Sequence, residues 1–135
     1  MSAQAATGFG ERMKAVFYFQ VAYCLGTMTW NIAGLILKSQ GMRSPGPTAS
    51  PAIAAVAVII IAALVIGLRK WPVVYGLVSA LVMLLVIPSI LNAFTADPAL
   101  WPSDFWRYTG AALNALGFVS CAIGVIGYMR WIKKR

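Results

Sequence analysis

The sequence has no histidine, three acidic residues and two cysteines among its 135 residues. Without histidine it cannot ligate haem through an imidazole, and the common zinc patterns are incomplete. Cys24 and Cys121 are too far apart in the sequence to form a Cys-x-x-Cys redox motif. We therefore expect no cofactor and no bound metal, and the sequence assigns no residue a catalytic role.

Charge is also scarce. Charged residues make up 10% of the chain and hydrophobic residues 61%, whereas roughly a quarter of the residues in soluble proteins are charged. The net charge is +8, but the cations lie beside apolar runs and form no basic face. They are predicted to anchor helix ends in a lipid bilayer and not to bind nucleic acid.

The apolar residues form four runs, each close to the roughly 20 residues that a helix needs to cross a bilayer. Their approximate bounds are 15–37, 51–68, 73–94 and 108–129. Only a helix satisfies its own backbone in hydrocarbon, so even the β-branched second run is predicted to be helical. We expect an all-α polytopic membrane protein in which residues 1–135 form one domain, an up-down bundle of four transmembrane helices.

Proline and glycine mark the connections between these runs. The segment 39–50 contains several of both and is predicted to be a loop. Ser50 followed by Pro51 is a typical helix start, because serine can cap a free backbone N–H and proline has none to satisfy. Pro88 is predicted to kink the third span, because it removes one helical hydrogen bond.

Lysine and arginine counts predict the orientation. An even number of spans puts both termini on one side, which then carries eight cations against three on the other. The eight are Arg12, Lys14, Arg69, Lys70, Arg130, Lys133, Lys134 and Arg135, and the three are Lys38, Arg43 and Arg107. The positive-inside rule then places both termini in the cytoplasm, in a multi-pass protein of the plasma (cell inner) membrane. The basic tail Arg130, Lys133, Lys134 and Arg135 is expected to contact anionic lipid headgroups.

The segment "NAFTADPALWPSDFWRYTG", residues 92–110, interrupts the apolar sequence with turn residues, acids and aromatic rings. It is predicted to be the outward-facing loop before the fourth span. Its tryptophans, Trp101 and Trp106, suit the membrane interface. Asp104 lies three residues before Arg107, a spacing that favours a helical ion pair.

Two helices carry a face of distinct composition. On the first span, the polar stripe consists of Gln20, Cys24, Thr27 and Asn31. We expect it to face inward and to form hydrogen bonds between helices; a lining for a ligand or solute path is the alternative. On the fourth span, the small-residue seam consists of Gly110, Asn114, Gly117, Cys121 and Gly124. Small residues let another helix approach closely, and that helix can be span one or a helix of a second copy.

Several polar residues of different spans share the same depth near the outer surface. We consider a polar pocket formed by Asn31, Asn92, Asn114, Ser89, Asp97, Asp104, Trp101 and Trp106. The tryptophan loop would roof it and the two aspartates would lie at its rim. The simpler interpretation, which we favour, is that the amides only bond one another or backbone groups freed by Pro88.

No acidic or basic residue falls within the four spans, and catalysis or proton-coupled transport in a membrane usually needs one. We therefore predict a non-catalytic protein that acts by helix association, as an accessory or assembly subunit or a small homo-oligomer. The alternative is a small transporter or carrier of a neutral or cationic apolar solute. Cys24 and Cys121 lie at similar depth; inert packing is favoured over a disulfide.

Overall fold

The computed structural model describes residues 3–134, with side chains from residue 8 onward. Within that range the chain is all-helical. The helices are α1 (Ala3–Ser39), α2 (Pro51–Arg69), α3 (Pro72–Thr95) and α4 (Asp104–Ile132), with a short 3-10 helix η1 (Pro98–Leu100) before α4. The predictions of an all-α chain and of four long helices are confirmed. Each of the four apolar runs lies within one helix.

Three of these helices, α2, α3 and α4, are long and apolar enough to cross a membrane. The longest helix, α1, has 37 residues and is not among them. Its central part includes Gln20 and Asn31, whose amides make it less apolar than the other three.

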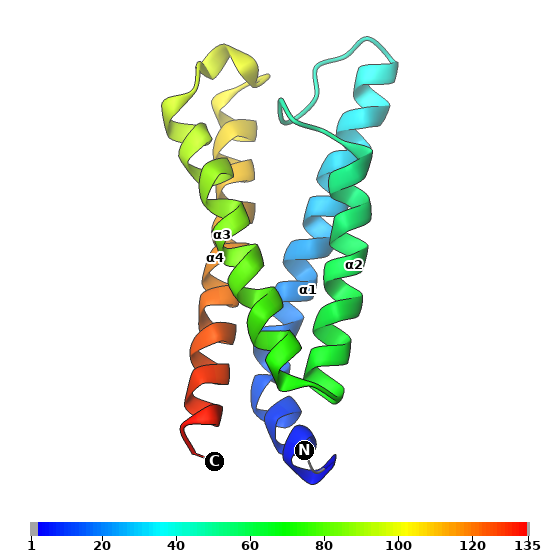
Figure 1. Ribbon diagram of the computed structural model, residues 1–135. Coiled ribbons are helices and arrows are strands. Elements are labelled where there is room, and N and C mark those ends of the chain that lie inside the picture. The colour runs from blue at the N-terminus through cyan, green and yellow to red at the C-terminus, as the bar shows by residue number, and fades with distance from the viewer. Residues whose placement is uncertain (1–2, 135) are drawn as a thin grey trace.

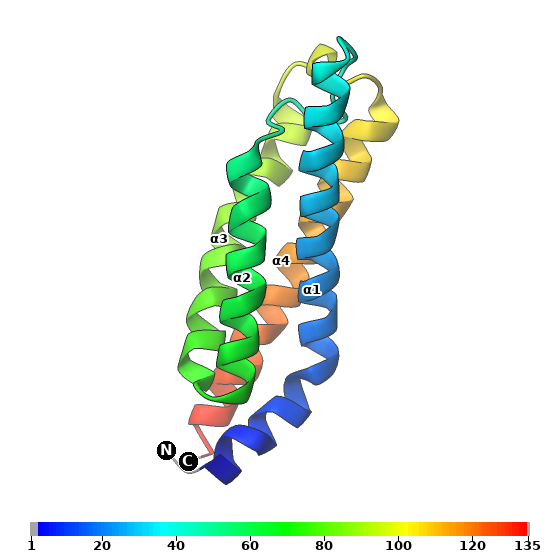
Figure 2. The ribbon, with the colours of Figure 1, turned by 90° about the vertical axis from the view of Figure 1, so that its right-hand side faces the viewer.

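The four helices run side by side in an up-down arrangement (Figures 1 and 2). Going around the bundle, α1 contacts α2 and α4, and α3 contacts the same two helices. Both ends of the chain and the tight α2–α3 turn lie at one end, which we call the terminal end (Figure 1). The opposite end, which we call the loop end, carries the two long connections, residues 40–50 and 96–103.

Local signals in the sequence account for the helix ends. The Ser50 side chain accepts a hydrogen bond from the backbone N–H of Ala52 at 3.2 Å, so the predicted start of α2 is confirmed. α1 ends at Ser39, and Gly41 in the turn that follows has φ 73°. Its N–H and that of Met42 turn back to carbonyls of the last helical turn, at 3.1 and 2.9 Å. Pro88 lies inside α3 without ending it.

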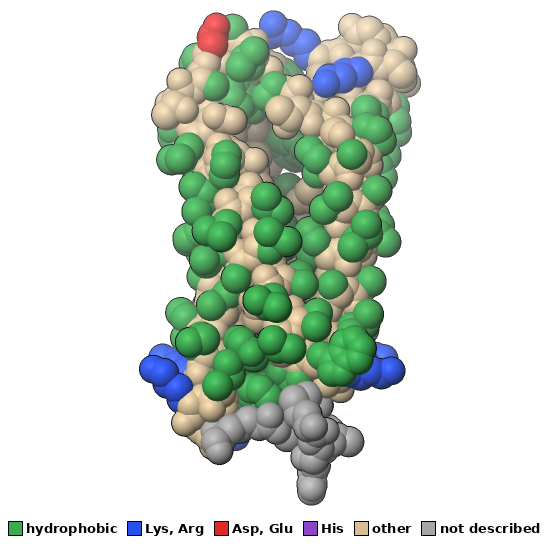
Figure 3. Space-filling model, in the orientation of Figure 1, with side chains coloured by type: hydrophobic (Ala, Val, Ile, Leu, Met, Phe, Trp, Pro, Cys, Tyr) green, Lys and Arg blue, Asp and Glu red, His purple; other side chains and the backbone are tan. Residues whose placement is uncertain are grey.

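The buried apolar residues form two clusters. The first lies in the middle of the bundle and consists of Tyr23, Cys24, Ala57, Val82, Val86 and Cys121. The second, nearer the terminal end, consists of Phe9, Met13, Leu64 and Tyr75. Outside these clusters large apolar side chains cover the surface between the two charged ends (Figure 3). Such a surface is suited to lipid and not to water.

Candidate functional site

A buried hydrogen-bond network crosses the bundle between α1, α3 and α4. The Tyr75 hydroxyl donates to Gln20 Oε1 at 2.7 Å, and Gln20 Nε2 donates to Ser79 Oγ at 3.0 Å and to Cys121 Sγ at 3.7 Å. Gln20, Tyr75 and Ser79 are all 0% exposed. Every polar group of the glutamine amide is thereby given a partner within the protein, as an apolar surrounding requires.

The polar stripe of α1 therefore has two parts. Gln20 belongs to the network, while Cys24, Thr27 and Asn31 line a cavity nearer the loop end. Cys24 and Cys121 are both buried free thiols. The stripe thus supplies one hydrogen-bonded tie between helices and part of one cavity wall, and a ligand or solute path along it stays a prediction.

The small-residue seam of α4 packs within this chain. A Cβ atom built on Gly117 would lie 2.7 Å from the Tyr23 ring, and one on Gly110 would lie 3.2 Å from the Trp30 ring. One on Gly124 would lie 2.8 Å from Gln20 Nε2. All three neighbours are on α1. Because α1 occupies the seam, a second copy would have to contact α4 elsewhere.

A cavity of about 420 Å³ lies between the four helices in the loop-end half of the bundle. Figure 3 shows the hollow on the face where the two helix pairs separate. Its inner part is apolar, with side chains of Cys24, Ala57, Ile60, Val82 and Val86. Its outer part includes amide and hydroxyl groups and a segment of the α1–α2 loop, residues 46–49. The cavity lining therefore changes from apolar to polar along the bundle axis, toward the loop end.

The structure brings together several of the residues considered for an outer polar pocket. Those in the lining are Asn31, Ser89, Asn92, Trp101 and Asn114. Trp101 is 7% exposed, so it closes part of the loop end. The others, Asp97, Asp104 and Trp106, lie outside the lining. Asp97 caps η1 through the N–H of Ala99, and Trp106 packs against Trp30 with ring centroids 5.8 Å apart.

The three asparagines differ in how their amides are used. Asn31 accepts from the N–H of Ser50 at 2.9 Å and donates to the carbonyl of Thr27 at 2.8 Å, so it ties the loop to α1. Asn114 donates to the carbonyl of Gly110 at 2.9 Å. Among the described residues the side-chain amide of Asn92 has no hydrogen-bond partner, and Asn92 is exposed at the cavity wall. The amides do not bond one another.

Arg107 is the one charged residue in the cavity lining among residues 8–134. Its side chain is 13% exposed, and Nη2 meets Asp104 Oδ1 at 3.1 Å, as the sequence spacing predicts. Nη2 also donates to the Tyr108 hydroxyl at 2.7 Å, and the guanidinium carbon lies 4.7 Å from that ring's centroid. Nε is buried without a hydrogen-bond partner in the described part of the chain.

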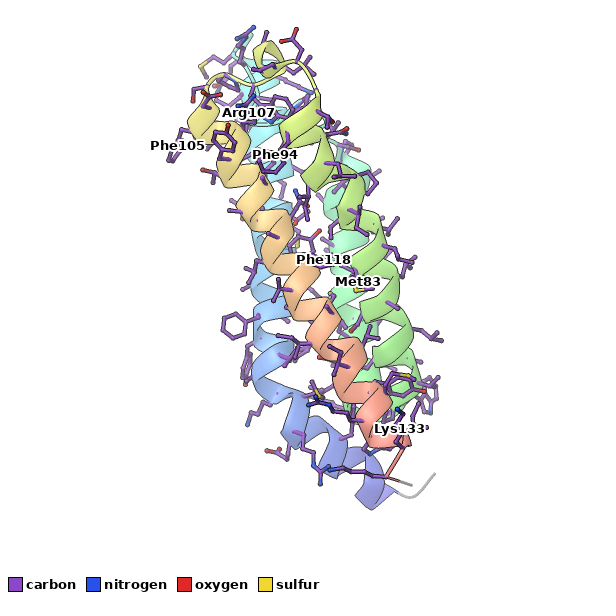
Figure 4. The ribbon with its side chains drawn as sticks, turned by 90° about the vertical axis from the view of Figure 1, so that its left-hand side faces the viewer. Met83, Phe94, Phe105, Arg107, Phe118 and Lys133 are labelled. Atoms are coloured by element: carbon purple, nitrogen blue, oxygen red, sulfur yellow. The ribbon has the colours of Figure 1, made fainter. Side chains whose placement is uncertain are left out.

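The sequence interpretation missed Arg107 as a cavity residue. It is one of three cations on the less basic side, and it lies within the aromatic loop segment at the start of the fourth span. That position could have identified Arg107 as a candidate cavity residue. Figure 4 shows it at the loop end of α4, whereas Phe105, two residues earlier, points away from the bundle.

The basic residues near the C-terminus lie around a second, smaller pocket at the terminal end, of about 220 Å³. Arg130 and Lys134 line it together with Arg12, Phe9 and Met13. Lys133 is exposed outside it (Figure 4), and Arg135 lies outside the described residues. Contact of this region with anionic lipid stays a prediction.

The fold and the site define a class only: a helical protein with three helices that are long and apolar enough to cross a membrane. Comparisons with models of protein families, with curated proteins and with solved structures found no match to this chain. Within residues 3–134 no group of three or more histidine, cysteine or acidic side chains could hold a metal ion.

Proposed function

We propose that the chain is a membrane protein with four spans, in which α1 is the fourth membrane-crossing helix. In support of this, α1 runs alongside α2 and α4 through the full height of the bundle (Figure 2). Its most polar side chains, Gln20 and Asn31, have hydrogen-bond partners inside the protein. Such pairing lowers the free-energy penalty of placing an amide in hydrocarbon.

Both termini lie on the cytoplasmic side of the plasma (cell inner) membrane in this proposal. Among residues 8–134, the terminal end carries seven lysines and arginines and the loop end three, and the more basic side of a membrane protein faces the cytoplasm. The cavity then opens in the outer half of the membrane.

The function that the geometry favours is the binding or carriage of a small amphiphilic molecule in the loop-end cavity. The observation that carries this proposal is the cavity's volume, about 420 Å³, together with its polar outer part and apolar inner part. Ligand pockets usually measure about 300–1,000 Å³ and combine apolar walls with a few convergent polar groups. Arg107 lines the cavity and its ion-pair partner Asp104 lies outside the lining, so a solute in the cavity meets the guanidinium and a neutral or anionic molecule fits better than a cation.

The role is a non-catalytic one in this proposal. Arg107 is the one formally charged group in the described lining. The Cys24 thiol and the Tyr23 phenol also line the cavity, but both side chains are packed in the apolar cluster in the middle of the bundle. Catalysis within a membrane usually needs an acidic or basic side chain at that depth. Association with another membrane protein stays a prediction. It would use helix faces other than the small-residue seam, which α1 occupies.

A matched pair of substitutions on α4 tests the binding role. Ala111 lines the cavity and is 8% exposed, whereas Ala112 is exposed and lies outside the lining. Ala111→Phe should fill the cavity, and Ala112→Phe should only add bulk to the outer surface. The protein is released from native membranes in mild detergent, and bound small molecules are detected by native mass spectrometry.

We expect a bound molecule on the unchanged protein and on the Ala112 variant, and its loss from the Ala111 variant. Thermal unfolding of both variants checks that they remain folded. Equal binding by the two folded variants would overturn the proposed site. If the Ala111 variant fails to fold, Ala111→Leu takes its place and the same comparison is made.

A further inference from the structure

The cavity's open side lies between α2 and α3. At the terminal end these helices are in close contact, since a Cβ atom on Gly67 would overlap the backbone at Tyr75. Toward the loop end they separate (Figure 1). The lining residues Ile53 and Val56 of α2 and Leu85 of α3 are 40, 46 and 58% exposed, so they border the mouth of the cavity.

The opposite side of the cavity, between α1 and α4, is closed. A Cβ atom on Gly26 would lie 2.7 Å from a Leu113 methyl group, and Gly110 and Gly117 likewise face rings of α1. The mouth is therefore lateral, and the part of its rim formed by Ile53, Val56 and Leu85 is apolar. A lateral mouth in a membrane protein opens into the acyl chains of the bilayer and not into water.

A positively charged side chain lies in the wall of the outer part of this cavity. Arg107 is the one charged side chain in the described lining, and its side chain is 13% exposed. Nη2 already pairs with Asp104 at 3.1 Å, so an anionic oxygen in the cavity would share the guanidinium with that carboxylate and add a charge-assisted hydrogen bond. On the α3 side of the mouth, Ser89 and Asn92 add an exposed hydroxyl and amide one helical turn apart.

From these features we infer that the cavity takes an anionic membrane lipid that enters sideways between α2 and α3. This inference rests on the proposed binding function and names the class of ligand. The headgroup oxygens contact Arg107, and Ser89 and Asn92 contact the polar region below the headgroup. One acyl chain lies along Ala57, Val82 and Val86, while the rest of the lipid stays in the bilayer. The network around Gln20 and Tyr75 lies beyond the inner part, toward the terminal end.

Headgroup selection is tested in nanodiscs that contain equal amounts of phosphatidylglycerol and phosphatidylcholine with identical acyl chains. The lipid that stays bound is identified by native mass spectrometry. We expect a preference of about fivefold or more for phosphatidylglycerol, as one charge-assisted hydrogen bond would give. Arg107→Gln should abolish the preference. Arg43→Gln removes a charge from the same end but outside the lining, and should leave it unchanged.

Absence of any preference in the unchanged protein, or an equal loss in the Arg43 and Arg107 variants, would overturn the inference. These outcomes are separable from a failure of the proposed function. If Ala111→Phe removes all bound lipid while Arg107→Gln changes nothing, the cavity binds a ligand but does not select an anionic one. If Ala111→Phe changes nothing, the binding function itself is wrong.

Lateral entry is tested by two neighbouring residues of α3. Leu85 lies at the cavity mouth and Leu84 outside the lining, with similar exposures of 58 and 59%. Deuterated phosphatidylglycerol is supplied to nanodisc-embedded protein, and the mass of the bound lipid is followed with time. Leu85→Trp should slow exchange several-fold, and Leu84→Trp should leave the rate unchanged. Equal rates for the two variants would exclude entry between α2 and α3.

Discussion

Replacing Gln20 by leucine should destabilise the bundle more than any exposed polar substitution in α1. The change removes the acceptor for the Tyr75 hydroxyl, 2.7 Å away, and the donor to Ser79 Oγ, 3.0 Å away. Leucine is close to glutamine in size, so the site is not left empty. The principal effect is a fully buried tyrosine hydroxyl with no acceptor.

The magnitude follows from the two bonds and the orphaned hydroxyl. Hydrogen bonds between membrane helices average about 0.6 kcal/mol, with a maximum near 1.7. A buried polar group left without a partner costs about 1–3 kcal/mol. Ser79 can turn its hydroxyl to a carbonyl of its own helix and so contributes little. We expect the free energy of unfolding to fall by about 2–3 kcal/mol.

A double-mutant cycle with Tyr75→Phe checks the cause of this loss. Once Tyr75 lacks its hydroxyl, Gln20→Leu removes a bond that is already broken and should be close to neutral. Unfolding is followed by circular dichroism in mixtures of mild detergent and dodecyl sulfate. Thr29→Val is the control, because Thr29 is exposed and bonds only the Leu25 carbonyl of its own helix. If the Gln20 and Tyr75 effects add to within about 0.5 kcal/mol, the coupling argued from the network is refuted.

Three further predictions concern packing, the loop and topology. Gly124→Ala should lower the free energy of unfolding by about 1–3 kcal/mol because the added methyl group would press on Gln20 and Ser79. Gly8→Ala, where a Cβ atom would meet nothing within 4 Å, should not lower it. Chemical denaturation in detergent compares the two variants. Asn31→Ala should free the N–H of Ser50 and speed hydrogen exchange across residues 46–50; protection as strong as before would contradict that tie. In a background without Cys24 and Cys121, cysteines introduced at positions 99 and 134 should react with an impermeant thiol reagent from opposite sides of the membrane; labelling of both from one side would reject the proposed topology.

Much of the fold could be predicted because the relevant signals are local. Apolar runs of about 20 residues mark the helices, and Ser50 with Pro51 marks the start of α2 in the structure. The ion pair of Asp104 with Arg107 needs only a spacing of three on one helix. Each of these features depends on neighbours within a few residues of sequence.

The candidate site was harder to predict because it depends on how separate helices face each other. Depth along each helix indicated that Asn31, Asn92 and Asn114 share one level, and the structure places all three at the same cavity. Depth alone does not say where the side chains bond. The Asn31 side chain bonds the α1–α2 loop. Arg107, which the sequence indicated only as a topology signal and an ion-pair partner of Asp104, lines the cavity.

The sequence by itself determined the four helices, most of their approximate ends and the small-residue face of α4, because composition and periodicity act within one segment. The start of α1 is the exception, because the helix begins at Ala3 and not near residue 15. Tertiary structure decided that this face packs against α1, that Gln20 meets Tyr75 and Ser79, and that α2 and α3 separate toward the loop end. The physical reason is that a helix's own sequence fixes which of its residues share a face. Which helix covers that face, and at what angle, depends on side-chain packing among all four.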